Sequence, residues 1–334
     1  MTALVEVQDL AKVFDVSAPW LNRVIERKPR LFVHAVDGVS FSIERGKTLA
    51  LVGESGCGKS TVARLLVGLY QPTRGTVRFD GQATGAARDP GELRLLRRRM
   101  QMIFQDPYAS LNPRWKVLDI VGEPLREHAL VNPSKGGAGE MRDRVAALLQ
   151  SVGLAAADTE KFPHQFSGGQ RQRISIARAL ATQPEFLVCD EPTSALDVSV
   201  QAQVLNIMKD LQRKQGLTYL FISHNLAVVR HVADQVGVMY LGRLVELADK
   251  ADLFAKARHP YTRMLLDAIP DIHMSGRRRT PVQGEVPNPL SPPAGCAFHP
   301  RCPNANARCS AERPALKTFA GIQVACHAVE EGRI

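Results

Sequence analysis

The chain has 334 residues, 45% of them hydrophobic and 23% charged, which is typical of a folded soluble protein and enough for one large domain with an appendage or for two domains. No apolar stretch approaches the roughly 20 residues that span a bilayer. The N-terminal residues alternate like a strand rather than forming a signal peptide, so we expect a cytosolic protein. The net charge of +10 is compatible with a nucleic acid, an anionic membrane surface or a polyphosphate as partner.

Basic residues gather in two short clusters, Arg94–Met100 and Arg277–Arg279. Neither is interleaved with aromatic residues, as a surface that stacks single-stranded nucleic acid would be. For each cluster a solvated surface is the favoured interpretation, and no nucleic-acid partner is expected.

Strand and helix patterns alternate along most of the chain. A first strand is expected near Leu4–Val7, an irregular stretch follows, and residues 35–53 read as strands around two glycine-containing turns. Further strands are expected at 48–52, 75–81, 185–192 and 217–225, with a hairpin at 234–247 that turns at Gly242. Helices are expected from Lys59, across most of 92–153, after each of the strands 185–192 and 217–225, and at 250–256 and 260–269.

This alternation predicts an α/β fold with a mostly parallel sheet. A helical block at about 92–165 is expected to form a subdomain beside it. The composition changes after Pro270, where proline and glycine become frequent and argue against a long helix or a central strand. We therefore expect a main domain at 1–270 and a tail module at 271–334.

The segment GESGCGKS, Gly53–Ser60, satisfies the pattern G-x-x-x-x-G-K-[ST] between a buried strand and an amphipathic helix. Its glycines let backbone N–H groups point at phosphate oxygens, and the positive end of the following helix faces the same way. Lys59 is expected to bind the β- and γ-phosphates and Ser60 to bind Mg²⁺; Cys57 is a small loop residue rather than a redox group. Nucleotide binding is predicted for Gly53, Glu54, Ser55, Gly56, Cys57, Gly58, Lys59, Ser60 and Thr61.

Two carboxylates, Asp190 and Glu191, follow a buried strand at its carboxyl end, where ligands gather in parallel sheets. Asp190 is expected to hold Mg²⁺ and Glu191 to orient or deprotonate the attacking water; an exposed acidic turn is the alternative. His224 ends the next strand and could hydrogen-bond the γ-phosphate or the water, although a lone histidine at a strand end is more often structural.

A second loop suited to an anion lies at FSGGQ, Phe166–Gln170. Ser167 is expected to cap a helix that begins near Gln170, and Gly168 and Gly169 leave the first N–H groups of that helix uncovered. One chain would then carry two phosphate-holding loops for one nucleotide.

Five separated motifs, in this order, resemble the ATP-binding-cassette (ABC) ATPase family over about residues 4–250: Gly53–Ser60, Gln105, Ser167–Gln170, Asp190–Pro192 with Ser194–Asp197, and His224. The resemblance implies a P-loop NTPase core with an antiparallel β subdomain and a helical signature subdomain. It also implies a head-to-tail dimer, in which the Ser-Gly-Gly loop of one subunit meets the ATP of the other. Phe166 stands where leucine is commoner in the family, a conservative departure.

The same resemblance implies roles for three further residues. Gln105 would sense Mg²⁺ and pass the nucleotide state to a membrane partner. Asp197 would lie at the dimer seam. Phe14 would stack on adenine, where tyrosine is more usual. ATP and Mg²⁺ are the cofactors that the family implies.

Four stretches, 104–114, 195–206, 258–270 and 284–303, resemble the ATPase subunits of oligopeptide and dipeptide importers, and the last looks like the second of their two ATPases. The implied role is to power import of di- or oligopeptides from the cytoplasmic face of the inner membrane. The implied partners are a second homologous ATPase, two permease subunits and, indirectly, a peptide-binding protein. Nickel and glutathione importers share this family and remain alternatives.

Two other classes of function compete with transport. A soluble ABC ATPase acting on ribosomes or DNA usually carries two cassettes or a long coiled coil, whereas this chain has one phosphate loop, one signature loop and no heptad run. A metal- or redox-responsive module in which ATP is secondary is the third interpretation, and it rests on the C-terminal cysteines.

Four of the 6 cysteines fall near the C-terminus, at Cys296, Cys302, Cys309 and Cys326. A cytosolic chain is not expected to keep disulfides, so crowded thiols in a loop-rich tail read as a metal or cluster site. The spacing lacks the C-x₂-C pairs usual in zinc sites. Four cysteines can hold a 4Fe–4S cluster, and the importer family is associated with one here; we favour it, in a structural role, over zinc and over free thiols. His299 and His327 are possible additional ligands.

Overall fold

The computed structural model describes residues 3–27, 29–84, 89–131, 137–268 and 284–334. It forms two compact units of several segments each: unit 1 comprises Met1–Leu4, Ile43–Thr48 and Ala86–Ser223, and unit 2 comprises Val5–Ser42, Leu49–Gly85 and His224–Ile334. The expected division at residue 270 and the cluster Arg277–Arg279 lie outside the described residues. Within the described ranges, no helix combines the length and the apolar character that crossing a bilayer requires.

Unit 1 is built on three parallel strands in the order β6, β7, β8. These strands are β6 (Met100–Ile103), β7 (Phe186–Asp190) and β8 (Thr218–Ile222). Every residue of β7 and β8 is buried, as expected of strands covered on both faces. β6 interrupts the stretch that was expected to be mostly helical: its sequence MQMI follows a helix without a glycine or proline between them, and only pairing with β7 makes it a strand.

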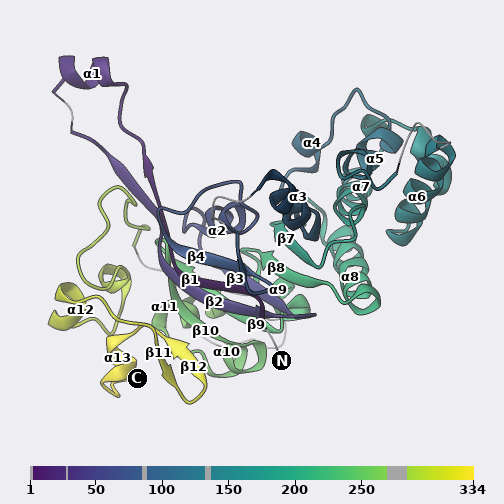
Figure 1. The fold of residues 1–334 in the computed structure, drawn as a ribbon. Coiled ribbons are helices and arrows are strands. Elements are labelled where there is room, and N and C mark those ends of the chain that lie inside the picture. Colours follow the sequence, from purple (N-terminus) through teal and green to yellow (C-terminus); the bar gives the residue numbers. More distant parts are fainter. Residues whose placement is uncertain (1–2, 28, 85–88, 132–136, 269–283) are drawn as a thin grey trace. The chain divides into compact units, whose positions relative to one another are not determined.

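The helical block expected at about 92–165 is present around β6. Its helices are α3 (Pro90–Arg99), α4 (Pro107–Ser110), α5 (Val117–Glu127) and α6 (Gly137–Ser151), followed by the short 3₁₀ turns η2 (Ala156–Glu160) and η3 (Pro163–Gln165). α5 and α6 pack on each other and on α7 (Gly168–Leu180), which also contacts α8 (Val198–Gln215). Figure 1 shows these helices in dark blue to teal.

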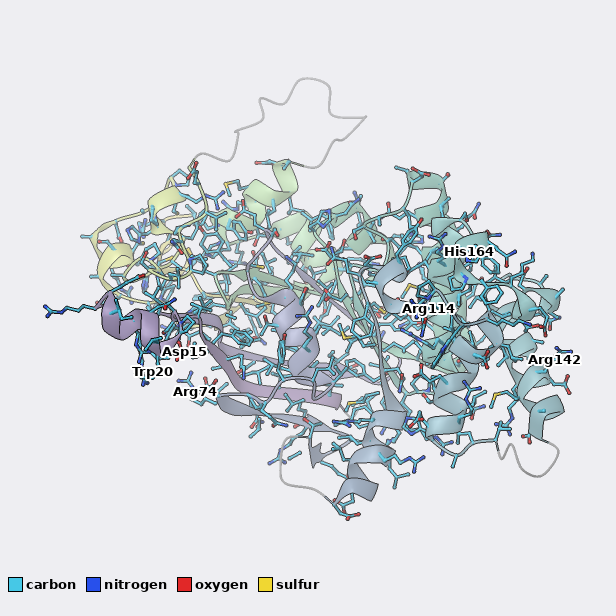
Figure 2. The ribbon with its side chains drawn as sticks, turned by 90° about the horizontal axis from the view of Figure 1, so that it is seen from above. Asp15, Trp20, Arg74, Arg114, Arg142 and His164 are labelled. Carbon is cyan, nitrogen blue, oxygen red and sulfur yellow. The ribbon has the colours of Figure 1, made fainter. Side chains whose placement is uncertain are left out.

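Unit 2 contains an antiparallel sheet in the order β2, β1, β4, β5. Its strands are β1 (Ala3–Asp15), β2 (Phe32–Glu44), β4 (Arg74–Phe79) and β5 (Gln82–Ala83). β2 runs straight through Gly38, one of the two expected turns, whose φ of 77° is accommodated inside the strand. The stretch expected to be irregular contains α1 (Trp20–Ile25), which lies at the tip of the connection between β1 and β2 (Figure 1). Trp20, labelled on this helix in Figure 2, is 69% exposed.

The other sheet of unit 2 runs β11, β12, β10, β9, β3. β3 (Thr48–Val52) pairs in parallel with β9 (Gln235–Tyr240), which forms the expected hairpin with β10 (Arg243–Asp249). The turn residues Leu241 and Gly242 both have positive φ, 41° and 78°, as a two-residue hairpin turn requires. The helices of this unit include α2 (Lys59–Leu66), α9 (Leu226–Val232), α10 (Lys250–Lys256) and α11 (Pro260–Asp267).

The described part of the tail joins this sheet. β12 (Ile322–Val324) pairs antiparallel with β10, and β11 (Lys317–Phe319) pairs with β12. Figure 1 shows α12 (Ala307–Ala311) and α13 (His327–Glu330) of this segment in yellow. The segment also contains the 3₁₀ turn η4 (His299–Arg301). The sequence did not predict these strands, because each is only three residues long and is formed by pairing rather than by pattern.

Candidate nucleotide site

The phosphate loop of unit 2 is shaped by two glycines that lie against neighbouring backbone. Gly53 has φ of 150° and Gly58 has φ of 102°, where Gly58 caps α2. A Cβ on Gly53 would lie 2.2 Å from the carbonyl oxygen of Met239, and one on Gly58 would lie 2.1 Å from that of Ala35. Only glycine fits both positions, so the loop is fixed by β9 on one side and β2 on the other.

Lys59, the first residue of α2, is only 5% exposed. Its ammonium group donates to the carbonyl oxygens of Gly53, at 2.8 Å, and of Glu54, at 3.0 Å. The charge is thereby held inside the curve of the loop, while Ser55 and Gly56 are exposed at its tip. A cation held beside the N-terminus of a helix, where backbone N–H groups are uncovered, is an arrangement suited to phosphate.

Cys57 and the two hydroxyl residues complete the loop. The Cys57 thiol is buried, which raises its pKa, and lies 3.6 Å from the Lys59 ammonium. Ser60 and Thr61 stand in the first turn of α2 and are half-buried. A protonated, enclosed thiol agrees with the interpretation of Cys57 as a small packing residue.

Two residues that sequence reasoning missed also lie at this loop. The Glu54 N–H donates to the hydroxyl of Tyr261 at 2.9 Å, and the Glu54 carboxylate accepts from both guanidinium nitrogens of Arg301, at 2.7 and 2.9 Å. The side chain of Glu54 therefore faces protein rather than the mouth of the loop. No local sequence signal could identify the pair, because Arg301 is 247 residues away from Glu54.

Unit 2 also holds Phe14 and His224. The ring of Phe14 meets Tyr70 edge-on at 5.4 Å, with the Lys12 ammonium 5.2 Å from its centre. His224 is exposed and immediately precedes Asn225, whose side chain caps α9 by accepting from the N–H of Ala227. The roles of Phe14 with adenine and of His224 with the γ-phosphate remain predictions.

In unit 1 the two predicted carboxylates occupy different surroundings. Asp190 ends β7 and is 3% exposed. Glu191 is half-buried and has a left-handed backbone with φ of 45°, a conformation that costs a non-glycine residue about 1–2 kcal/mol. Its N–H donates to the carbonyl of Ile222 at 3.0 Å, and its carboxylate accepts from the Gln105 amide at 3.2 Å. The fold thus brings Gln105 and Glu191 together, 86 residues apart.

Ser167 caps α7, as expected, although the helix begins at Gly168 rather than near Gln170. The Ser167 hydroxyl accepts from the N–H of Gln170 at 3.3 Å, and the Gln170 side chain accepts from the N–H of Ser167 at 2.9 Å. This reciprocal capping box fixes the loop. Asp197 lies at the start of α8, exposed, next to Val198, which is 82% exposed.

The four C-terminal cysteines are free thiols. Burial, and to a lesser degree the nearby Cys309, Cys326 and Cys302, raises the pKa of Cys296 to about 11, and the N–H of Cys296 donates to the carbonyl of Cys309 at 2.8 Å. Yet no three His, Cys, Asp or Glu residues of the described chain are grouped to hold a metal ion. Neither the expected 4Fe–4S cluster nor the zinc alternative therefore finds support in the geometry of the described residues. His327 instead contacts the carbonyl of Glu312, and His299 contacts that of Cys296.

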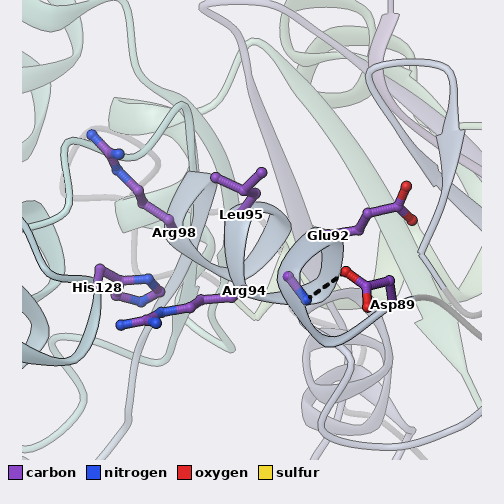
Figure 3. A pocket seen from close by; sticks show the side chains of 7 residues that line it. Asp89, Glu92, Arg94, Leu95, Arg98 and His128 are labelled. Carbon is purple, nitrogen blue, oxygen red and sulfur yellow. Dashed lines mark hydrogen bonds between the residues drawn. The ribbon is translucent and has the colours of Figure 1, made fainter.

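A hollow in unit 1 contains none of the predicted site residues (Figure 3). It is lined by Asp89, Gly91, Glu92, Arg94, Leu95, Arg98 and His128. Burial lowers the pKa of His128, and Arg94 and Arg98 lower it further. Arg94 is exposed here and Arg98 half-buried, in agreement with a solvated surface for this basic cluster.

Comparison with known proteins agrees with the motifs. Residues 36–194 match the ABC transporter family, and residues 245–309 match the C-terminal region of oligopeptide/dipeptide transporters. The di/tripeptide transport ATP-binding protein DppF of Pseudomonas aeruginosa (strain UCBPP-PA14) is 51% identical over 99% of both chains. The oligopeptide transport ATP-binding protein AppF of Bacillus subtilis (strain 168) is 46% identical over 97% of both.

Solved structures show the same fold. The ATP-binding cassette MJ0796, in a dimeric post-hydrolysis state bound to ADP and Pi, matches with a TM-score of 0.63 and 27% identity over 74% of this chain and 98% of its own. cbiO1 from Clostridium perfringens, part of the ABC transporter complex cbiONQ, matches with a TM-score of 0.62 and 26% identity over 76% of this chain and 91% of its own. The expected α/β ABC ATPase fold is confirmed, and the chain belongs to the ATP-binding proteins of the oligopeptide/dipeptide group of ABC transporters.

Proposed function

We propose that this chain is the ATP-hydrolysing subunit that powers import of di- or oligopeptides through a membrane ABC permease. The observation that carries the proposal is similarity over nearly the whole chain to ATP-binding proteins named for di/tripeptide and oligopeptide transport, at 51% and 46% identity. The match of residues 245–309 to the C-terminal region of such transporters supports the same substrate class.

We assign the residues of the site to the steps of ATP hydrolysis. Gly53–Thr61 bind the phosphates through backbone N–H groups and the Lys59 charge. Glu191 orients or deprotonates the attacking water, a role worth about 10²- to 10⁴-fold in rate; its hydrogen bond from Gln105 supports this, because the amide fixes the direction of the carboxylate. His224 is assigned to the γ-phosphate and Phe14 to adenine. Mg²⁺, held by Ser60, Gln105 and Asp190, would neutralise phosphate charge.

The loop Ser167–Gln170 is assigned to the nucleotide of a partner ATPase, which answers why the chain carries two phosphate-binding loops. The N-terminus of α7 is closed by the Ser167–Gln170 capping box. Val198, which is exposed beside Asp197, supports a dimer seam at that position. The proposed assembly contains a second, homologous ATPase and two permease subunits, supplied by a peptide-binding protein. The chain would be peripheral, on the cytoplasmic face of the inner membrane.

Nickel or glutathione import by the same kind of assembly is the second candidate, since those importers share the family. A soluble, non-transport ABC ATPase is the third candidate, which the similarity to transport proteins disfavours.

We further propose that residues 271–334 form a C-terminal extension of an ATPase domain at 1–270, attached to its sheet through β12, and that Cys296, Cys302, Cys309 and Cys326 hold a 4Fe–4S cluster in this extension. The chemistry of the donor set supports the cluster: four unpaired thiols close enough to influence one another electrostatically. A 4Fe–4S cluster is held by four cysteine thiolates, which is the number of thiols that this segment supplies. It would order the tail.

The proposal is tested by purifying the tagged full-length chain from native membranes, anaerobically, and identifying what accompanies it by mass spectrometry. Two multi-span permease subunits and a second ABC ATPase are expected. Recovery of the chain alone in the soluble fraction, or with ribosomes or DNA, would overturn the transport assignment and leave the ATPase.

The same anaerobic preparation tests the cluster by its absorption spectrum and its iron content. A brown protein with iron at the stoichiometry of one cluster is expected. Colourless, iron-free protein that contains zinc would contradict the cluster proposal. The proposal would also be contradicted if all four Cys→Ser variants kept the iron signal.

A further inference from the structure

The C-terminal segment reaches the phosphate loop through a buried cation, Arg301. Its side chain is 2% exposed, and it spans both carboxylate oxygens of Glu54, at 2.7 and 2.9 Å. The same guanidinium donates to the Tyr240 hydroxyl at 3.3 Å. A bidentate, largely desolvated pair of this kind has a fixed direction and is stronger than a surface ion pair.

The position of Arg301 is itself tightly set. η4 holds its backbone, with the Arg301 N–H donating to the carbonyl of Phe298 at 3.0 Å and the Cys302 N–H to that of His299 at 3.2 Å. Phe298 is fully buried and packs edge-on against Tyr240 and at a tilt against Tyr261, each at 5.4 Å. Tyr261 in turn accepts from the Glu54 N–H. Both the backbone and the side chain of Glu54 are therefore fixed by residues outside the loop.

The pairing of Arg301 with Glu54 offsets a negative charge that the loop sequence places beside the phosphate site. Glu54 follows the first glycine of a loop assigned to bind a polyanion, and an unpaired carboxylate there would repel the phosphates. Because Glu54 is only partly exposed, the repulsion would be screened less than at the surface. Arg301 cancels that charge and holds the side chain away from the loop mouth.

We propose that Arg301 is a positioning residue for ATP binding: the C-terminal segment 296–302 neutralises Glu54 and braces the phosphate loop, and thereby sets the affinity for nucleotide. The inference rests on the assignment of residues 53–61 to the ATP phosphates. It requires no cluster and no partner subunit.

The experiment measures the dissociation constant of a fluorescent, non-hydrolysable ATP analogue for the full-length chain, together with its melting temperature without nucleotide. Arg301→Gln exposes the Glu54 charge and is expected to weaken binding about tenfold, the loss typical of one charge-assisted contact. Arg301→Lys keeps the charge but not the two-point geometry, so an effect of about threefold is expected. Lys317→Gln removes another ion pair of the C-terminal segment, with Glu330, and is expected to leave affinity unchanged.

The decisive variant is the double one, Arg301→Gln with Glu54→Gln. If Arg301 acts by cancelling the Glu54 charge, removing the carboxylate restores the affinity for the analogue to within about threefold of the wild type. If Arg301 acts only as a structural support, the second substitution should weaken binding further. Wild-type affinity in Arg301→Gln, or a double variant as weak as the single one, would overturn the proposal. If Arg301→Gln does not fold, wild-type affinity in Arg301→Lys would overturn the proposal instead. Failure of the wild-type chain to bind the analogue would instead defeat the assignment of the loop.

Discussion

His259 shows how one buried side chain supports the residues around the phosphate loop. It is 1% exposed, and burial lowers its pKa to about 3. Its neutral ring accepts from the N–H of Tyr261 at 3.1 Å through Nδ1 and so caps α11. The backbone N–H of His259 donates to the Glu246 carboxylate at 3.0 Å. The neutral ring is required for the cap, because a protonated Nδ1 cannot accept.

This pKa shift predicts a pH-dependent stability. The unfolded chain protonates His259 near the ordinary value of 6.5, whereas the folded chain does so only near 3, so stability is complete above pH 6.5 and falls as the pH drops through that window. Between pH 7.5 and 5.5 this histidine should remove about 1.4 kcal/mol of unfolding free energy. Urea unfolding at both pH values, with His259→Asn as a variant that keeps a cap acceptor, measures the difference.

Glu246 works in the opposite direction, because burial raises its pKa and its stabilising effect is greatest at low pH. Glu246 is present in both the wild type and His259→Asn, so the difference between their pH-dependent stabilities isolates the contribution of His259. An equal loss of stability in the wild type and in His259→Asn would contradict the prediction.

At the scale of single residues, the sequence predicted local geometry where a short pattern determines it. Gly53, Lys59 and Ser167 lie in short patterns whose backbone geometry follows from the residues themselves, and each stands where the pattern placed it. Arg301, Tyr261 and His259 were not predictable in these roles. Their partners lie far along the chain or depend on burial, which is a property of the fold.

At the scale of elements, the packing of α7 on α8 gives one glycine of the signature loop a structural reason. A Cβ on Gly169 would lie 2.2 Å from the Cγ1 of Val200 in α8, whereas one on Gly168 would meet only the Leu196 side chain, at an ordinary 3.6 Å. The two glycines were interpreted alike from the sequence, as residues that leave N–H groups uncovered. The structure separates them, because only Gly169 is required for the helices to approach.

Gly169→Ala is therefore expected to lower the unfolding free energy by about 1–3 kcal/mol, the usual cost of overpacking. Gly168→Ala should be neutral or stabilising by up to about 1 kcal/mol, since alanine favours helix more than glycine does. Chemical unfolding of the two variants gives the comparison directly, and both keep the Ser167 cap. Equal effects of the two substitutions would show that the contact with Val200 relaxes without cost.

Elements of strong periodicity were predictable from the sequence, and short ones were not. The sequence located β3, α10 and the hairpin at Gly242, because a buried apolar run, an amphipathic turn and a positive-φ glycine are local signals. β6 and β12 depend on neighbours for their conformation. Gly38 carries a positive φ inside β2, where a glycine more often marks a turn.

At the scale of the whole molecule, the proposed dimer predicts that the Glu191 carboxylate controls how long the two ATPases stay closed around ATP. The left-handed backbone of Glu191 is energetically unfavourable, but its N–H is bonded to Ile222 and its side chain to Gln105. Backbone strain of this kind often marks a functional residue. Glu191→Gln keeps the shape and removes the base. In the assembly purified from membranes, this variant should bind ATP and retain it through gel filtration, because the closed state is no longer emptied by hydrolysis.

The matched variant is Ser167→Arg, which places a bulky charge at the capped N-terminus of α7 but leaves the phosphate loop of the same chain untouched. ATP binding by the isolated chain should survive, while nucleotide trapping in the assembly should be lost when Ser167→Arg is combined with Glu191→Gln. The measurements are bound nucleotide after gel filtration and phosphate release. Normal turnover in Glu191→Gln would remove this residue from the catalytic role, and trapping that persists with Ser167→Arg would mean that the second loop does not serve the nucleotide of the partner.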